Sequence, residues 1–297
     1  MGDPQQSRWM PVLRGLPKGL LSHGAGWLAS LQLPRVLRPS VYRAFGRRVG
    51  VDFDEVRDPL VEYPSLQAFF TRALVAGARP IDARPDALVA PCDGAWGQAG
   101  RVEGGTLLQV KGREYRLAEL IRDEPLARAM EGGHYATFYL SPRDYHRFHA
   151  PCDGFVSRAE HVPGALWPVN AIGLHGVDRL FARNERICAQ WRLPGQVGAL
   201  PALCMVAVGA TMVGKIRLTF DDLTSHRRGA APSHRDYAAP GIALERGAQW
   251  GHFEFGSTLV LIAGEEAVDL DVRPPGTPLR LGERIGRLRA IPGNPAG

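Results

Sequence analysis

The 297-residue sequence has little cysteine and lacks the paired spacing on which disulfide frameworks and zinc sites are built. Its four cysteines stand far apart, and no two of them form a CxxC pair. They are Cys92, Cys152, Cys188 and Cys204. We therefore expect four small buried residues in a protein of a reducing compartment.

Long apolar runs are also absent. No run reaches the roughly 18 residues that a membrane-spanning helix requires. The longest uncharged stretch near the N-terminus, residues 19–34, is interrupted by serine, histidine and glutamine and lacks the layout of a secretory signal. An arginine-rich, acid-poor start leaves a mitochondrial transit peptide open. With 45% hydrophobic and 22% charged residues, the composition excludes a disordered or fibrous chain.

Acidic residues are almost missing from residues 1–50, which hold only Asp3 against eight lysines and arginines. This segment therefore carries a charge of +7, and because the whole chain carries +6, the remaining 247 residues carry −1. Such a distribution argues against a nucleic-acid-binding surface over the whole protein. It favours a local basic arm at the N-terminus.

Two amphipathic helices are predicted within this arm. Residues 16–33 place their apolar side chains within one arc of a helical wheel, between Pro17 and Pro34. A second segment follows Pro39, and its apolar face is formed by Val41, Tyr42, Phe45 and Val49. Short amphipathic helices with basic flanks are typical of an interfacial membrane anchor. The alternative is a pair of helices packed on the domain with solvated arginines.

The rest of the chain changes character after a strand-poor connector at residues 51–82, which contains one short predicted helix at 65–72. Short β-type runs then recur between glycines and prolines, at residues 106–110, 134–140, 155–161, 186–193, 204–220, 252–263 and 278–288. Helical periodicity is limited to about residues 117–131 and 177–182. We predict an α+β fold: a β-rich, antiparallel, partly barrel-like domain with an N-terminal amphipathic helical segment.

One pentapeptide, Ala-Pro-Cys-Asp-Gly, occurs twice, at residues 90–94 and 150–154. An internal duplication would explain it. We favour the simpler interpretation, because Pro-x-Asp-Gly is a common turn at the entry to a strand.

Polar residues are densest at residues 139–151, directly after an apolar strand. Because this segment is bounded by prolines, we expect a loop at a strand end, where His146 and His149 are candidates for catalysis. Two histidines three residues apart could bind a metal ion. No third ligand cluster with zinc-like spacing appears, so no metal site is predicted.

A Gly-Ser step at Gly256 and Ser257 interrupts a strand-like run. Glycine weakens a strand and often marks a bulge or a close backbone approach. A serine there can act as a nucleophile if a histidine deprotonates it and a carboxylate orients that histidine. The candidate set is Ser257, His149 or His146, and Asp93 or Asp153. A plain strand bulge is the alternative, and the lack of a Gly-x-Ser-x-Gly elbow disfavours an α/β-hydrolase.

Seven blocks, taken in chain order, make the sequence resemble the phosphatidylserine decarboxylases, the pyruvoyl-dependent enzymes of phospholipid synthesis. They are residues 69–72, 91–94, 139–151, 162–164, 181–186, 208–214 and 255–258. The Leu-Ser-Pro-Arg-Asp-Tyr-His-Arg-x-His block and the Gly-Ser-Thr step are the most specific. One departure is Phe255, where the best-known bacterial motif has leucine.

The resemblance implies a proenzyme that cuts itself between Gly256 and Ser257. The products would be a large chain, residues 1–256, and a small chain, residues 257–297, which begins with a pyruvoyl group derived from Ser257.

The resemblance also assigns roles to individual residues. The family's triad matches Asp93, His149 and Ser257, and its second histidine matches His146. It favours Asp93 over Asp153. His149, held by Asp93, would deprotonate Ser257. His146 would donate a proton during turnover, since a histidine near its ordinary pKa can do so at neutral pH.

The implied reaction is decarboxylation of phosphatidylserine to phosphatidylethanolamine through a Schiff base to the pyruvoyl group, which is the electron sink that loss of CO₂ requires. Residues 1–50 would be a membrane-associating arm and residues 51–297 the catalytic domain. The implied partners are the phosphatidylserine substrate, the membrane surface and the two chains of one proenzyme; a homodimer is left open, and no nucleic acid is expected.

The implied location is the cytoplasmic face of the bacterial inner membrane, with the mitochondrial inner membrane as the alternative. Two other classes of protein compete with this interpretation. They are an autoproteolytic serine hydrolase without a pyruvoyl group, and a non-enzymatic membrane-binding β module.

Overall fold

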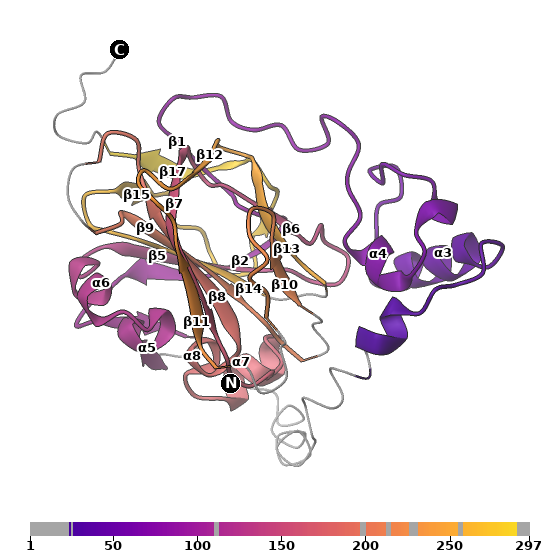
Figure 1. Ribbon diagram of the computed structural model, residues 1–297, viewed down its shortest axis with the longest axis horizontal. Helices are drawn as coiled ribbons and strands as arrows, with labels where there is room; N and C mark the ends of the chain where they lie inside the picture. Colours follow the sequence, from indigo (N-terminus) through magenta and orange to yellow (C-terminus); the bar gives the residue numbers. More distant parts are fainter. Residues whose placement is uncertain are drawn as a thin grey trace.

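A large antiparallel sheet forms the centre of the protein (Figure 1). The computed structural model describes residues 24, 26–109, 113–196, 200–211, 215–225, 231–254 and 258–289. The strands of the sheet are β2 (Gly94–Arg101), β5 (His134–Tyr139), β7 (Gly154–Val162), β8 (Arg186–Arg192), β9 (Leu203–Val208), β11 (Ser233–Asp236), β12 (Ile242–Leu244), β14 (Thr258–Ala263) and β16 (Pro278–Leu279). Their order is β11-β7-β8-β9-β14-β5-β2-β16, with β12 also paired to β7.

This topology confirms the predicted β-rich, antiparallel α+β class. The prediction of a partly barrel-like domain is not borne out. Within the described residues the path of strands ends at β11 on one side and at β16 on the other, so the sheet stays open.

Smaller antiparallel sheets accompany the large one. The first consists of β1 (Ala87–Val89), β17 (Arg284–Leu288) and β15 (Val268–Leu270). The second consists of β10 (Ile216–Leu218), β13 (Gln249–Phe253) and β6 (Arg147–His149). A two-stranded sheet joins β3 (Thr106–Leu108) to β4 (Glu114–Arg116).

Strand β14 lies in the middle of the large sheet, between β5 and β9. All six of its residues are buried, which is why its sequence is a continuous apolar run rather than an alternating one. Leu259 and Leu261 belong to one hydrophobic cluster, and Val260 and Ile262 belong to another. The sheet therefore separates two cores.

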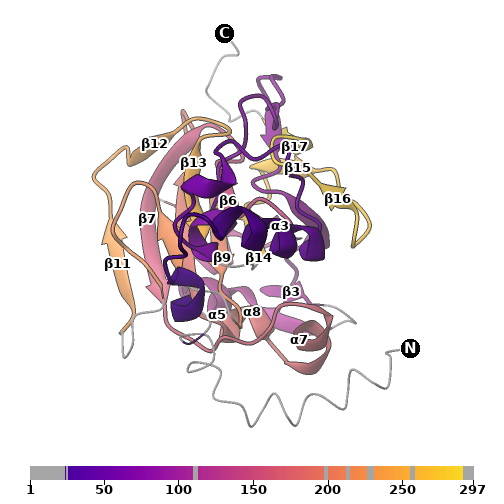
Figure 2. The same ribbon diagram turned by 90° about the vertical axis from the view of Figure 1, so that its right-hand side faces the viewer.

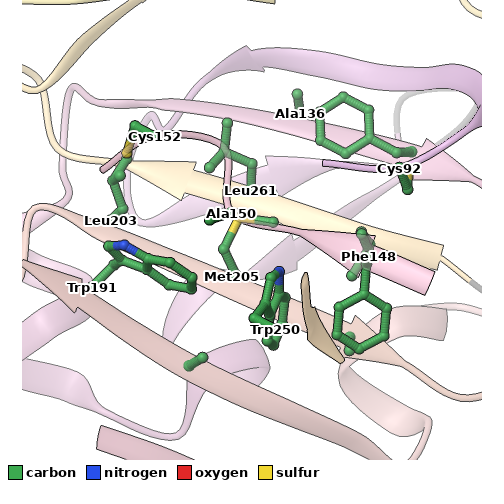
Figure 3. Packing of buried hydrophobic residues seen from close by; sticks show 14 of the residues in the cluster. Cys92, Ala136, Phe148, Ala150, Cys152, Trp191, Leu203, Met205, Trp250 and Leu261 are labelled. Carbon is green, nitrogen blue, oxygen red and sulfur yellow. The ribbon is translucent and has the colours of Figure 1, made fainter. Parts of the chain in front are cut away.

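The first core lies between the large sheet and the two three-stranded sheets, and it contains Trp191, Trp250 and Phe148 (Figure 3). It also contains Cys92 and Cys152, one from each copy of the repeated pentapeptide. Each copy ends in a glycine that begins a strand, β2 or β7, which confirms the interpretation as a turn before a strand. All four cysteines are free and buried, as predicted.

The second core lies on the other face of the sheet, beneath a group of short helices. They are α5 (Leu117–Ile121), α6 (Glu124–Ala129), α7 (Ala171–Gly176) and α8 (Leu180–Arg183). The single helix predicted over residues 117–131 is broken in two. Arg122 adopts a left-handed conformation with φ 55°, and the Asp123 side chain then accepts a hydrogen bond from the Leu126 amide as the cap of α6.

Three predicted strand runs are also divided. The run at 204–220 becomes β9 and β10, the run at 252–263 becomes β13 and β14, and the run at 278–288 becomes β16 and β17. In each case the two strands belong to different sheets. Residues 255–257, with the predicted cleavage bond, fall between β13 and β14 and lie outside the described residues.

The N-terminal helices lie at the right of Figure 1, on the side of β6, β13 and β10, and Figure 2 views them face on. They are α3 (Arg38–Val49), the 3₁₀ turn η1 (Leu60–Glu62) and α4 (Leu66–Phe70). The Tyr42 ring on α3 stacks on Phe69 with centroids 5.0 Å apart, and its hydroxyl donates to the Tyr63 carbonyl at 2.9 Å. The second predicted helix is therefore present as α3, with Tyr42 turned toward the connector.

The first predicted helix, residues 16–33, is described only at residue 24 and from residue 26 onward, where residues 26–30 are helical. Large apolar side chains in and after this segment are exposed: Trp27 and Leu28 at 65% and Val36 at 84%. None of the described helices combines the length and the apolar character needed to cross a membrane.

Candidate active site

The sequence-predicted site residues gather around the turn at residues 90–94 and strand β6. Gly256 and Ser257 lie outside the described residues, and the chain is described again from Thr258. Thr258 is buried and pairs with Tyr139 on β5 and Val208 on β9. The backbone to which Ser257 is bonded is thus held in the centre of the large sheet.

His149 ends strand β6, and its amide donates to the Pro91 carbonyl at 2.7 Å. This bond brings the histidine backbone to the turn that carries Asp93. The ring Nδ1 lies 2.8 Å from the Gly247 carbonyl, which can only accept, so Nδ1 carries the ring proton. Nε2 is therefore unprotonated, and its lone pair accepts a hydrogen bond from the Tyr145 hydroxyl at 3.2 Å.

The electrostatic surroundings keep His149 neutral. Burial lowers its pKa, while the hydrogen bond to Gly247 and the charge of Asp93 act in the opposite direction. A neutral imidazole with a basic Nε2 is the form that can remove a hydroxyl proton.

Asp93 is buried directly before β2, and its carboxylate forms an ion pair with Arg79. Arg79 Nε lies 2.8 Å from Oδ1, and Nη2 lies 2.5 Å from Oδ2. The same guanidinium binds both oxygens of Glu55, at 2.9 and 2.7 Å. Among the described residues Asp93 therefore contacts the connector, and the predicted hydrogen bond from His149 to Asp93 is not formed.

Asp153, the rival acid at the second Asp-Gly turn, lies in a different environment. Its side chain is exposed, and Oδ1 accepts the Arg246 amide at 2.7 Å. Asp153 thus fixes the turn at Arg246. The carbonyl of the next residue, Gly247, accepts the hydrogen bond from His149 Nδ1. The two turns share a sequence, but only the first carries a buried carboxylate.

His146 is wholly buried, and its ring centroid lies 4.0 Å from that of Phe70 on α4. Its Nδ1 donates to the Asp144 carbonyl at 2.8 Å. Nε2 is buried and has no hydrogen-bond partner within the described part of the chain. Burial lowers the pKa of His146 to about 3, so the ring is neutral at pH 7. The premise that this histidine keeps an ordinary pKa is therefore wrong.

Several residues that position this site were missed from the sequence, and most come from the connector. Besides Phe70 and Arg79, Arg72 donates from Nη2 to the Arg143 carbonyl at 2.8 Å. Arg147 Nε in turn donates to the Thr71 carbonyl at 3.0 Å. The signal was available in the block at residues 69–72, which contributed only to the family resemblance.

A cavity of about 250 Å³ opens beside Asp93. Its lining includes Arg72, Arg79, Gly94 and Tyr145, and Tyr145 also contacts His149. Through the described residues, no group of three or more histidine, cysteine or acidic side chains is arranged to hold a metal ion.

Residues 66–287 match the family model described as phosphatidylserine decarboxylase. The chain belongs to the phosphatidylserine decarboxylase family. The matched residues run from α4 to the last residues of β17, so they include the end of the connector and both cores. The resemblance drawn from the motifs is confirmed.

Curated relatives extend the likeness over nearly the whole chain. The phosphatidylserine decarboxylase proenzyme of Anaeromyxobacter sp. (strain K) is 42% identical over 281 residues, which cover 94% of this chain and 97% of the relative. The proenzyme of Acidovorax ebreus (strain TPSY) is 41% identical over 283 residues, 93% and 96% of the two chains. That of Myxococcus xanthus (strain DK1622) is 36% identical over 280 residues, 94% and 97%.

Proposed function

We propose that the protein decarboxylates phosphatidylserine to phosphatidylethanolamine, using a pyruvoyl group made from its own Ser257. The observation that carries this proposal is the family match over residues 66–287. The site agrees with it, because burial lowers the pKa values of two imidazoles, wholly buried His146 and partly buried His149, and the charge of buried Asp93 acts on His149. The relatives are named proenzymes, which supports a maturation step.

Self-cleavage begins with a proton transfer. His149 accepts the Ser257 hydroxyl proton at Nε2, and Ser257 Oγ attacks the carbonyl carbon of Gly256. The carbon–nitrogen bond breaks, the nitrogen takes the proton, and an ester replaces the peptide. Loss of the Ser257 Cα proton then expels the Gly256 carboxylate and leaves dehydroalanine. Addition of water releases ammonia and leaves the pyruvoyl cap.

The residues next to the end of β13 fit such a group, because His146, whose carbonyl accepts the Phe253 amide at 2.9 Å, has a buried Nε2 without a hydrogen-bond partner in the described chain. When present, a pyruvoyl group supplies the carbonyl that condenses with the substrate amine and the electron sink for loss of CO₂. His146 Nε2 holds the proton that replaces CO₂ on the substrate. Because its pKa is low here, it takes up that proton only beside an anion such as the substrate carboxylate.

Residues 1–50 form the membrane-associating arm of this proposal, and residues 51–297 the catalytic domain at the cytoplasmic face of the bacterial inner membrane. The exposed Trp27, Leu28 and Val36 support a surface that inserts at the interface. Replacing these three by serine should weaken binding to vesicles that contain phosphatidylserine. Self-cleavage should continue, because none of the three side chains reaches the buried site.

Mass spectrometry of the purified protein tests maturation directly. The unsubstituted protein should give residues 1–256 and a residue 257–297 fragment whose blocked N-terminus is trapped by an amine and borohydride. Ser257→Ala should remain one chain. His149→Ala should slow cleavage, whereas His146→Ala should cleave and release no CO₂. A small chain that begins with an ordinary serine would indicate autoproteolysis without a pyruvoyl group and overturn the proposal.

A further inference from the structure

Arg72, the residue two positions after α4, is a buried cation with unused hydrogen-bond donors. Only 4% of the residue is exposed. Its Nη2 donates to the carbonyls of Arg143 and Asp144, at 2.8 and 3.4 Å, and the Phe69 ring centroid lies 5.5 Å from Cζ. Its Nε and Nη1 are buried and have no hydrogen-bond partner within the described residues. A buried guanidinium left in this state is costly unless an anion completes it.

The carboxylates near Arg72 are already engaged by other groups. Asp93 is bound by Arg79, and Asp144 Oδ2 accepts both the amide and the hydroxyl of Ser141 at 2.7 Å. In the described chain no carboxylate forms an ion pair with Arg72, whereas Arg79 forms two. Among the described residues Arg72 therefore has no carboxylate paired with it, although Asp93, Asp144 and Glu55 act on it electrostatically.

Arg72 lines the cavity of about 250 Å³ beside Asp93. This volume equals that of about eight water molecules and lies below the roughly 300–1,000 Å³ of cavities for drug-sized ligands. It has room for a small polar headgroup and excludes two acyl chains. Tyr145 lines the cavity and its hydroxyl contacts His149 Nε2 at 3.2 Å, so a molecule bound there lies next to the proposed reaction centre.

We propose that this cavity is the headgroup subsite and that the Arg72 guanidinium binds the phosphodiester of the lipid. The proposal rests on the proposed function, because it takes the substrate to be a phosphoserine lipid. It adds a specificity-determining residue that touches the substrate.

The chemistry of decarboxylation selects the phosphodiester over the carboxylate as the partner of Arg72. The carboxylate loses its charge as CO₂ leaves, so a guanidinium bound to it would stabilise the ground state more than the transition state. The phosphodiester keeps its charge throughout the reaction. Binding it lowers KM without changing kcat, and this separation is measurable.

Steady-state kinetics of the matured enzyme with soluble sn-glycero-3-phosphoserine is the test. Arg72→Gln should raise KM roughly tenfold to hundredfold and leave kcat within about twofold, since one charge-assisted contact is lost. Arg72→Lys should recover part of the effect. Arg101→Gln is the matched control, because Arg101 is an exposed arginine paired with Glu265, outside the cavity. An unchanged KM, or a loss in kcat alone, would overturn the proposal.

If Arg72→Gln does not fold, competition for the substrate site of the unsubstituted enzyme tests the proposal instead. sn-Glycero-3-phosphoethanolamine should compete with the substrate, and L-serine and inorganic phosphate should be much weaker competitors. Equal competition by L-serine would assign Arg72 to a carboxylate, and equal competition by phosphate would indicate a simple ion site. Either result overturns the proposal.

Calorimetric binding of sn-glycero-3-phosphoethanolamine to the uncleaved Ser257→Ala chain separates this proposal from the proposed function. It needs no turnover and should weaken when Arg72→Lys is added. If the unsubstituted enzyme released no CO₂ while this binding held, the proposed function would fail and the anion subsite would stand. Absence of binding would overturn the subsite even in an active enzyme.

Discussion

Acidification should destabilise the fold through His146 in particular. The ring is fully buried, makes one hydrogen bond through Nδ1, and has a pKa of about 3 instead of the ordinary 6.5. The folded state therefore binds this proton more weakly than the unfolded chain. The resulting stability is fully present above about pH 6.5 and is lost as the pH falls from there toward 3.

The magnitude follows from the two pKa values. Between pH 7.5 and pH 5.0 the unfolded chain takes up nearly a full proton at this position and the folded protein almost none. The difference costs about 2 kcal/mol in the free energy of unfolding. That is a large share of the roughly 5–15 kcal/mol by which a typical protein is stable.

Urea unfolding of the uncleaved Ser257→Ala chain at both pH values measures this term. His146→Asn places an amide nitrogen where Nδ1 donates and removes the titration, so the pH-dependent loss should shrink by about 2 kcal/mol. His149 and His252, whose pKa values burial also lowers, contribute equally to both proteins and cancel. His234→Asn is the control, because that side chain is half exposed. Equal losses with and without His146 would refute the reasoning.

Two further predictions concern the connector. Arg79→Gln leaves the buried Asp93 carboxylate without its cation and the partly buried Glu55 with Arg280 alone, so the free energy of unfolding should fall by about 3–5 kcal/mol in urea titrations. Tyr42→Phe removes the hydrogen bond to the Tyr63 carbonyl and should cost about 1 kcal/mol. Tyr42→Ala also removes the aromatic stack and should cost about 3–5 kcal/mol in the same assay.

Matched controls exist for both predictions. Arg84 forms an exposed pair with Asp82, so Arg84→Gln should change stability very little. Val41 is next to Tyr42 on α3 but is 39% exposed, so Val41→Ala should have a small effect. Equal losses for Arg79→Gln and Arg84→Gln would show that the buried ion pair of Arg79 stabilises the fold no more than the exposed pair of Arg84.

The strands of the central sheet were predictable where burial itself sets the sequence. β14 is a nearly continuous apolar run, and β5 and β8 are buried along most of their length, because neighbours cover both their faces. Strand β2 was missed, since it contains three glycines and no apolar alternation. Its conformation comes from its partner: a Cβ at Gly97 would lie 2.2 Å from Thr137 Oγ1 on β5. Such a close approach is a tertiary fact that local propensity does not contain.

The candidate site shows a similar division. Residue types and a polar, proline-bounded loop were enough to select His146, His149 and an Asp-Gly turn. What holds these groups was not visible, because Arg79 comes from a segment interpreted as a connector. The Gly247 carbonyl that orients His149 is backbone and has no residue signature at all. The low pKa of His146 likewise depends on burial that only the assembled fold creates.

The position of β14 determines whether a cut between Gly256 and Ser257 would let two copies of the protein exchange fragments. The new chain would begin as a strand with six residue pairs on each side, to β5 and to β9 of the other chain. It would also supply β15, β16 and β17 to their sheets. Two copies of the protein could therefore not trade fragments without dismantling their cores. Each copy would then mature only for itself, and one that failed to cut could not be rescued by a fragment from its neighbour.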